Sequence, residues 1–176
     1  GRFMDKVGTK RGFAISIKSA HRTLRVERHT HEDAHFVLLL DGHYVSTARG
    51  AGHLHAEPAL IYNPPGTTHR DTFPDRIGRF LGVSVSRDRF AEANELGKPV
   101  DEAERIWEPA PLAIAHRIGE LVVRDAPALA IEAACLELSS ALLLVPSLDH
   151  FGAMGDLDAR RGGLVDHPFV RLFERP

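Results

Sequence analysis

Three histidines stand close together at the start of an apolar segment, in the stretch RHTHEDAHFVLLLDG (residues 28–42). His29 and His31 are two residues apart, so on a β-strand their side chains leave the same face and can converge on one ion. His35 keeps the same parity four residues later. Imidazole nitrogens suit zinc, iron, nickel and copper, and they suit magnesium or calcium poorly. The spacing therefore predicts a transition-metal site.

A fourth candidate ligand, His69, follows the segment NPPGTT (residues 63–68). Pro and Gly form a rigid turn there, which can bring the end of a second strand beside the first. Seven of the eleven histidines lie from His29 to His69, which favours a shared site over separate surface positions. We expect His29, His31, His35 and His69 to bind one divalent transition metal, zinc first, with iron, nickel or copper as alternatives.

The other histidines have no predicted part in metal binding. His53 and His55 repeat the two-residue spacing within GAGHLHAEP, and we expect both to face solvent on a loop. His21 and His43 are expected at the surface or on a lid. His116 is expected to pack on a helix, as single histidines in helices usually do.

The elements that must position these side chains are short strands. From Phe13 to Ser86 the apolar residues come in brief groups, such as FAISI, ALIYN and RFLGVSVS, with turn-forming residues between them. This rhythm is typical of an all-β sandwich or a small jelly-roll barrel. Asp41-Gly42 predicts a two-residue hairpin turn, because glycine accepts the positive φ angle that such a turn needs.

After about Pro109 the apolar spacing becomes helical. PLAIAHRIGELVVRD and PALAIEAACLELSSALLLV place apolar residues three and four positions apart, which predicts two helices. We expect Asp125 to cap the second helix and Pro127 to lie in its first turn. The connection is then short and the helices run antiparallel. The expected fold is mainly β with C-terminal helices, a jelly-roll barrel followed by an antiparallel helix pair.

The second predicted helix has two apolar faces. One consists of residues spaced by four and three: Ile131, Cys135, Leu138, Leu142 and Val145. The other is a stripe of leucines seven residues apart: Leu129, Leu136 and Leu143. A single domain buries only one face, so the leucine stripe either joins a second subunit or packs under the barrel. The first alternative predicts a homodimer whose interface contains these leucines.

Two motifs around the histidines resemble those of cupins. Residues 29–42 read H-x-H-x3-H-x6-G, and residues 64–69 read P-x-G-x2-H. The chain matches the cupin pattern at six positions: His29, His31, Gly42, Pro64, Gly66 and His69. It departs at His35, which replaces a glutamate and leaves the charge of the ion uncompensated, so that an anionic guest is favoured. The resemblance implies a cupin-like barrel over residues 10–95.

The layout of the chain is similar to the N-terminal effector-binding and dimerisation domain of AraC-type transcription regulators. There the barrel is followed by a two-helix dimerisation segment, here residues 109–146, and by a linker or tail, here residues 147–176. The resemblance implies a small-molecule effector and a homodimer. DNA would be bound only through a C-terminal helix-turn-helix module, absent from this chain, which needs on the order of a hundred more residues. The expected ligand-binding residues are Tyr44, Tyr62, Phe36 and Leu38.

The alternative is a stand-alone metal-dependent cupin enzyme of the dioxygenase or isomerase class. A metal with open coordination positions activates water or oxygen. Acid-base groups beyond the ligands are few, and spacing places none of them. These groups are Tyr44, Tyr62, Glu27 and Glu32. No catalytic residue is therefore predicted, and a sensor is favoured over an enzyme. A zinc-bearing anti-sigma or storage cupin is a third class.

Composition excludes several other kinds of protein. The 22 Lys and Arg residues against 24 Asp and Glu give a net charge of −2, so no basic surface is available to hold a nucleic acid by counterion release. The single cysteine, Cys135, forms no internal disulfide and is typical of a reducing cytoplasm. No apolar run is long enough to cross a bilayer or to act as a signal peptide. We expect a soluble cytoplasmic protein with no membrane partner.

Overall fold

A computed structural model of the chain describes residues 6–21, 25–51, 54–56, 58–74, 77–93, 95 and 101–142. The predicted tail lies outside these residues. The described strands are β1 Lys6–Lys10, β2 Phe13–His21, β3 Arg25–Thr30, β4 Ala34–Asp41, β5 His43–Ser46, β6 Leu54–Ala56, β7 Ala59–Asn63, β8 Thr68–Thr72, β9 Ile77–Val85 and β10 Glu104–Ile106. The described helices are α1 Arg87–Ala93, α2 Pro109–Val123 and α3 Ala128–Ala141.

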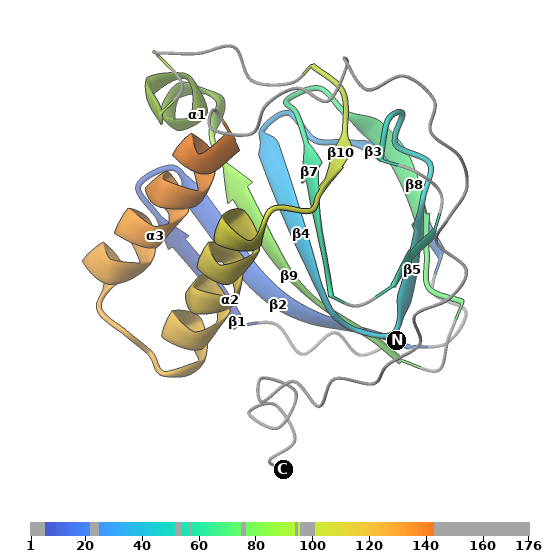
Figure 1. The fold of residues 1–176 in the computed structure, drawn as a ribbon, viewed down its shortest axis with the longest axis horizontal. Coiled ribbons are helices and arrows are strands. Elements are labelled where there is room, and N and C mark those ends of the chain that lie inside the picture. The colour runs from blue at the N-terminus through green and yellow to red at the C-terminus, as the bar shows by residue number, and fades with distance from the viewer. Residues whose placement is uncertain are drawn as a thin grey trace. The chain divides into compact units, whose positions relative to one another are not determined.

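The strands form two antiparallel sheets that face each other across an interior (Figure 1). The larger sheet has the order β1-β2-β9-β4-β7-β10, and the smaller has the order β3-β8-β5-β6. Neighbours in both sheets are mostly distant in sequence, as expected where a chain alternates between two sheets of a jelly roll. The predicted fold class, mainly β with C-terminal helices, is confirmed.

Strand β4, in the middle of the larger sheet, is buried on both faces. Phe36 and Leu38 point to one side and belong to the core beneath the helices. Val37 and Leu39 point to the other side and belong to the core between the sheets. Because successive side chains of a strand leave opposite faces, a strand covered on both sides is apolar throughout. The unbroken run FVLLL is the sequence of such a strand.

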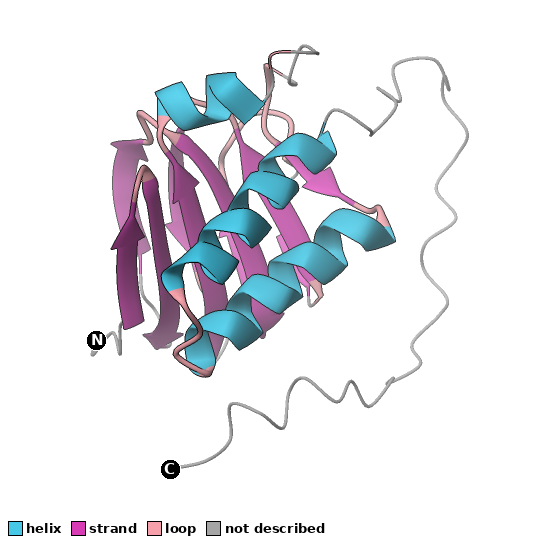
Figure 2. Ribbon diagram, turned by 90° about the vertical axis from the view of Figure 1, so that its left-hand side faces the viewer, coloured by secondary structure: helices cyan, strands magenta, loops and turns pink. Residues whose placement is uncertain are grey.

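Helices α2 and α3 lie side by side on the outer face of the larger sheet (Figure 2). Ile118 of α2 and Leu138 of α3 are fully buried in this contact. Cys135 is buried beside them and is not in a disulfide, and burial raises the pKa of its thiol to about 12.

Among the described helices, none has the length and apolar character needed to cross a bilayer.

The link between the two helices differs in detail from the prediction. Helix α3 begins at Ala128, and Pro127 is its N-cap residue, without a side-chain capping hydrogen bond. Asp125 instead adopts a left-handed conformation with φ of 50°. The prediction that Asp125 caps α3 is therefore wrong, because this residue is used to turn the chain.

The Asp41-Gly42 turn does not close a hairpin. Gly42 has the expected positive φ of 84°. However, β4 pairs with β7 and β9 in the larger sheet, whereas β5 pairs with β6 and β8 in the smaller one. Since both edges of β4 are already occupied, β5 cannot pair with it. The turn leads the chain from one sheet into the other, and the hairpin prediction is wrong.

Candidate functional site

Three of the predicted ligands meet at one end of the interior. His29 on β3 and His69 on β8 are direct partners across neighbouring strands. His31 follows β3, and the turn before β8 fixes its backbone: the N–H of Gly66 donates to the carbonyl of His31 at 2.7 Å, and the N–H of His31 donates to the carbonyl of Thr67 at 3.0 Å. One ring nitrogen from each histidine lies within 4.8 Å of the other two.

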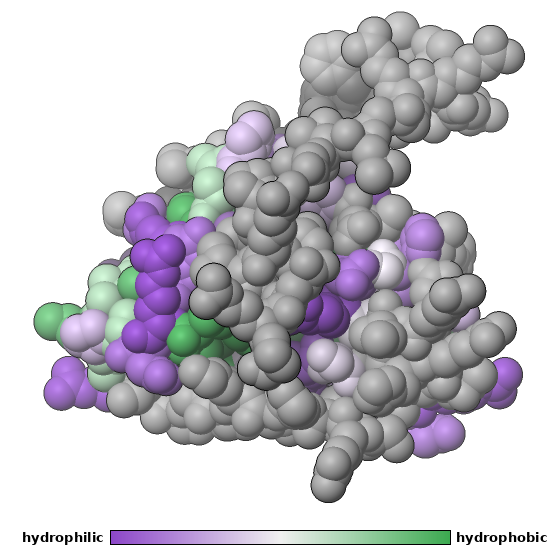
Figure 3. Space-filling model, turned by 90° about the horizontal axis from the view of Figure 1, so that it is seen from below, coloured by the Kyte–Doolittle hydropathy of each residue, from purple (hydrophilic) through white to green (hydrophobic). Residues whose placement is uncertain are grey.

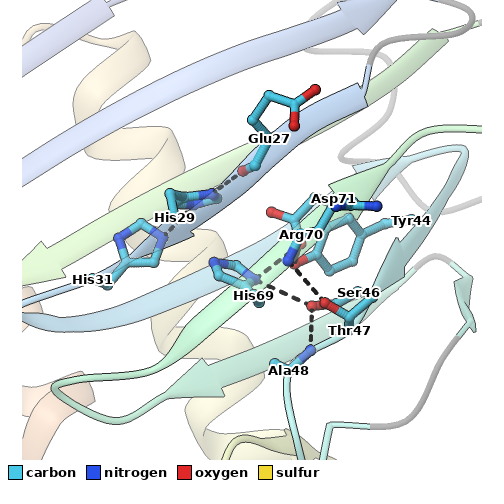
Figure 4. Close-up of polar contacts among 10 residues, drawn as sticks. All are labelled: Glu27, His29, His31, Tyr44, Ser46, Thr47, Ala48, His69, Arg70 and Asp71. Carbon is cyan, nitrogen blue, oxygen red and sulfur yellow. Dashed lines mark hydrogen bonds and ion pairs between the residues drawn. The ribbon is translucent and has the colours of Figure 1, made fainter.

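The nitrogens of His29 and His31 are spaced as ligands of one ion would be. Their Nε2 atoms are 3.1 Å apart. In tetrahedral geometry, two nitrogens that each lie about 2.0–2.1 Å from a zinc ion are about 3.3–3.4 Å apart, a little more than the separation seen here. The Nδ1 of His29 donates to the carbonyl oxygen of Glu27 at 2.8 Å, which leaves the lone pair on Nε2, the atom nearest His31 (Figure 4).

His69 is held by a carboxylate. Its Nδ1 lies 2.9 Å from Oδ1 of Asp71 and 3.2 Å from Oγ of Ser46. Because the carboxylate accepts a hydrogen bond from the N–H at Nδ1, Nε2 of His69 carries a lone pair. This Nε2 is buried and has no hydrogen-bond partner among the described residues. A buried polar atom without a partner costs free energy, and a metal ion at this position would supply one. The three histidines therefore fit a metal.

Asp71 and Ser46 were not predicted from the sequence. The Asp71 side chain also accepts a hydrogen bond from the hydroxyl of Tyr44 at 3.0 Å (Figure 4). Burial raises the pKa of Tyr44, so its hydroxyl stays protonated as a donor. Asp71 was detectable in principle, because it follows His69 by two residues on the same strand and so shares its face.

His35 lies beside the three converging ligands without joining them. Its Nδ1 is 2.8 Å from Oγ of Ser84, and its ring stacks on that of His31 with centroids 4.2 Å apart and planes 7° apart. The ring also lies beside Gly82, where a Cβ would be 3.4 Å from Cε1 of His35. The structure thus brings together three of the four predicted ligands and places the fourth against the ring of His31.

Burial keeps two of these imidazoles neutral. Desolvation, followed by the nearby His69 and His29, lowers the pKa of His31 to about 4. Desolvation is also the main reason that the pKa of His35 is well below its usual value. Neutral imidazole is the form that binds metal. Of the three converging histidines, His31 is therefore in the form that would bind an ion at neutral pH.

A cavity of about 380 Å³ extends from the histidines between the two sheets. Its lining residues are Ala14, Ile15, Ser16, Lys18, Val26, His29, His31, His35, Val37, Tyr44, His69, Asp71, Phe73, Phe80, Gly82 and Ser84. Of the predicted ligand-binding residues, Tyr44 lines this cavity. The other three belong instead to the core beneath the helices: Phe36, Leu38 and Tyr62. Their side chains leave β4 and β7 on the face of the sheet that points away from the cavity.

His55 was expected to face solvent, and this prediction is wrong. Its side chain is only 1% exposed, since residues 54–56 form a strand that pairs with β5 instead of a loop. The ring lies opposite Tyr44, with centroids 5.4 Å apart. Burial lowers the pKa of His55, so it is a neutral core residue. His53 lies outside the described residues.

The remaining candidates lie away from the cavity. Glu27, Glu32 and His43 are exposed, and only the backbone of Glu27 contacts the site. On α3, Leu129 is 74% exposed and Leu136 is 38% exposed. Leu143 lies outside the described residues, so the structure places two of the three predicted interface leucines at the surface.

The sequence matches no protein-family model and no curated protein. Several solved structures are similar to about half of it. A cupin superfamily protein from Desulfitobacterium hafniense is 14% identical with a TM-score of 0.44, over 48% of this chain and 78% of that one. A cupin family protein with a double-stranded β-helix fold from Methanocaldococcus jannaschii is 13% identical with a TM-score of 0.44, over 52% and 86%. A cupin 2 conserved barrel domain protein from Salinispora arenicola is 18% identical with a TM-score of 0.43, over 51% and 83%.

Proposed function

We propose that this chain is the effector-sensing and dimerisation domain of an AraC-type transcription regulator, with a divalent metal ion at one end of its cavity. The observation that supports this most strongly is that one cavity contains both a cluster of histidines and an apolar wall. Three imidazoles converge at one end, and the rest of the wall is largely apolar. Such a combination binds a small molecule and orients it through a few polar groups.

His29, His31 and His69 would hold the ion, and zinc is the first choice because it favours nitrogen ligands in tetrahedral geometry. The ion would supply positive charge that attracts an oxygen of the effector. With zinc in tetrahedral geometry, three protein ligands would leave one position for a further ligand. Asp71 fixes the orientation of His69 and partly balances the charge of the ion. His35 supports the ring of His31 from behind.

The proposed dimer would form through the helix layer. Helix α3 exposes Leu129 and Leu136, and green hydrophobic residues interrupt the purple surface on the left of Figure 3, the side that carries the helices in Figure 1. Beneath them, β4 presents Val37 to the cavity and Leu38 to the helices. A ligand that displaces β4 would therefore also act on the packing of α2 and α3.

The competing proposal is a stand-alone metal-dependent cupin enzyme. It is favoured by the open coordination position, which is a feature of catalytic metal sites. Tyr44 and Asp71, which also line the cavity, would be its acid-base groups. Both proposals use the same cavity, and they differ in what happens to the bound molecule.

One experiment separates the two proposals. Zinc- and iron-loaded protein is incubated with small phenolic and carbonyl compounds, and each mixture is examined both for a rise in melting temperature and for new products by mass spectrometry. A sensor gives compounds that raise the melting temperature and are recovered unchanged. Catalytic turnover of any compound that binds would contradict the sensor proposal and support the enzyme.

A further inference from the structure

One charged side chain of the cavity has no part in holding the proposed metal. Lys18, on β2, is among the lining residues. It is the direct partner of Phe80 on β9. Side chains that face each other across two strands have Cβ atoms about 4.5–5.5 Å apart, so a cation and an aromatic ring stand side by side on this wall.

The strand register places Lys18 at a distance from the histidines. Ala14 is the partner of Ser84, and Ser84 contacts the ring of His35. The ring of His35 also lies beside Gly82, which is the partner of Ser16. Lys18 is two residues beyond Ser16, which is about 7 Å at 3.3 Å per residue. The lysine and the histidines are therefore neighbouring but separate positions in one cavity.

The wall beside Lys18 is aromatic. The rings of Phe73 and Phe80 are stacked, with centroids 5.3 Å apart and planes 10° apart, and Tyr44 lies 5.5 Å from Phe73. Phe73 packs closely on Gly78, where a Cβ atom would lie 2.6 Å from the ring. The missing side chain of Gly78 therefore leaves room for this ring, which lines the cavity as an apolar surface for a flat guest.

The group of the lining that can pair with an anion is Lys18. It is the one lysine or arginine among the described lining residues, and Asp71 is the one carboxylate. The Oδ1 atom of Asp71 already accepts from Tyr44 and is paired with His69. Lys18 also contributes to the lowered pKa values of His31 and His35, so its positive charge acts within the cavity.

We propose that the cavity binds a small aromatic carboxylate, whose carboxylate pairs with Lys18 and whose ring packs on Phe73 and Phe80. This rests on the proposed function only in taking the cavity as the effector site. Recognition by Lys18 and the phenylalanines does not require the metal. A charge-assisted hydrogen bond to lysine would distinguish an acid from a neutral compound of the same shape.

A matched pair of probes tests the inference. 2-Naphthoate and 2-naphthamide have nearly the same shape and differ in charge, and their affinities are measured by isothermal titration calorimetry. We expect the acid to bind the unaltered protein at least about tenfold more tightly than the amide. Lys18→Met should remove this preference, and Lys18→Arg should keep most of it. Arg70→Met, which removes a charge from an exposed position on β8, should change nothing.

Each titration is carried out with zinc-loaded and with chelator-treated protein. A preference for the acid that needs Lys18 in both states supports the inference even if no metal binds. Zinc binding without binding of the acid would overturn the inference and leave the metal site standing. Equal binding of acid and amide by the unaltered protein, a comparison that needs no substitution, would also overturn it.

Discussion

Each of the three converging histidines is held by a different neighbour. A backbone carbonyl accepts from His29, the carboxylate of Asp71 accepts from His69, and the ring of His35 stacks on His31. Such outer contacts fix the ring orientation and the tautomer, and they contribute strongly to metal affinity. The site therefore extends beyond the residues that would touch the ion.

Asp71→Asn tests the support of His69. The amide oxygen of an asparagine can still accept a hydrogen bond from Nδ1 of His69. It lacks the negative charge of the carboxylate, which makes Nε2 of His69 a stronger metal ligand. We expect a loss of about 10- to 100-fold in zinc affinity, measured by competition with a chromophoric chelator. Asp88→Asn, an exposed change on α1, is the control. Unchanged affinity in Asp71→Asn would contradict this account of His69.

Single changes of the histidines to alanine should fall into two groups. Variants of His29, His31 and His69 should lose most of their bound metal, since two imidazoles do not restore the coordination geometry. His35→Ala should lose less, because it removes a stacked neighbour. Exposed His43→Ala should retain the full content. A His35→Ala variant as depleted as His69→Ala would show that His35 is a fourth ligand.

Buried neutral imidazoles also make metal-free stability depend on pH. The pKa of His31 is about 4 in the folded protein, against an ordinary value of 6.5. Between these values the unfolded chain binds more protons, so the free energy of unfolding should fall as the pH drops from 6.5 towards 4. Urea denaturation in chelator measures this fall. His31→Gln should make it shallower, and an unchanged slope would contradict the assignment.

At the scale of elements, the strands were predictable where turn-forming residues separate apolar groups. The face of each side chain was not. On β4 both parities are apolar, so nothing in FVLLL tells that Val37 lines the cavity while Phe36 and Leu38 lie beneath the helices. Residues 54–56 were missed because GAGHLHAEP has the glycines of a loop, and His55 is buried only through pairing with β5.

Helix α3 carries the prediction about assembly. Leu129 is 74% exposed and Leu136 is 38% exposed. Burying a fully exposed leucine contributes about 2 kcal/mol, and these two would contribute in proportion to their exposed area. Leu136→Glu should give a folded monomer in size-exclusion chromatography with its metal content unchanged. Ala113→Glu, an exposed change on α2, is the control. A Leu136→Glu variant that remains dimeric would place the interface elsewhere, and one that unfolds would place this leucine in the core.

At the scale of the whole molecule, the described residues form three layers: the smaller sheet, the larger sheet and the helix pair. The cavity lies between the first two layers, and the proposed dimer surface lies on the third. The histidine spacing indicated residues of which the structure brings three together at one end of this cavity: His29, His31 and His69. Lys18 and Phe73 were not predicted, because they come near Phe80 only through the pairing of β2 with β9 and the packing of one sheet against the other.

The most direct test of the central claim is the metal content of the protein. The chain is purified without a chelator and without a metal-affinity tag. Its content of zinc, iron, nickel and copper is then measured by inductively coupled plasma mass spectrometry. We expect about one equivalent in total in the unaltered protein and far less in His69→Ala. Well under one equivalent of these four metals in the unaltered protein, with none taken up on adding zinc, would contradict the account.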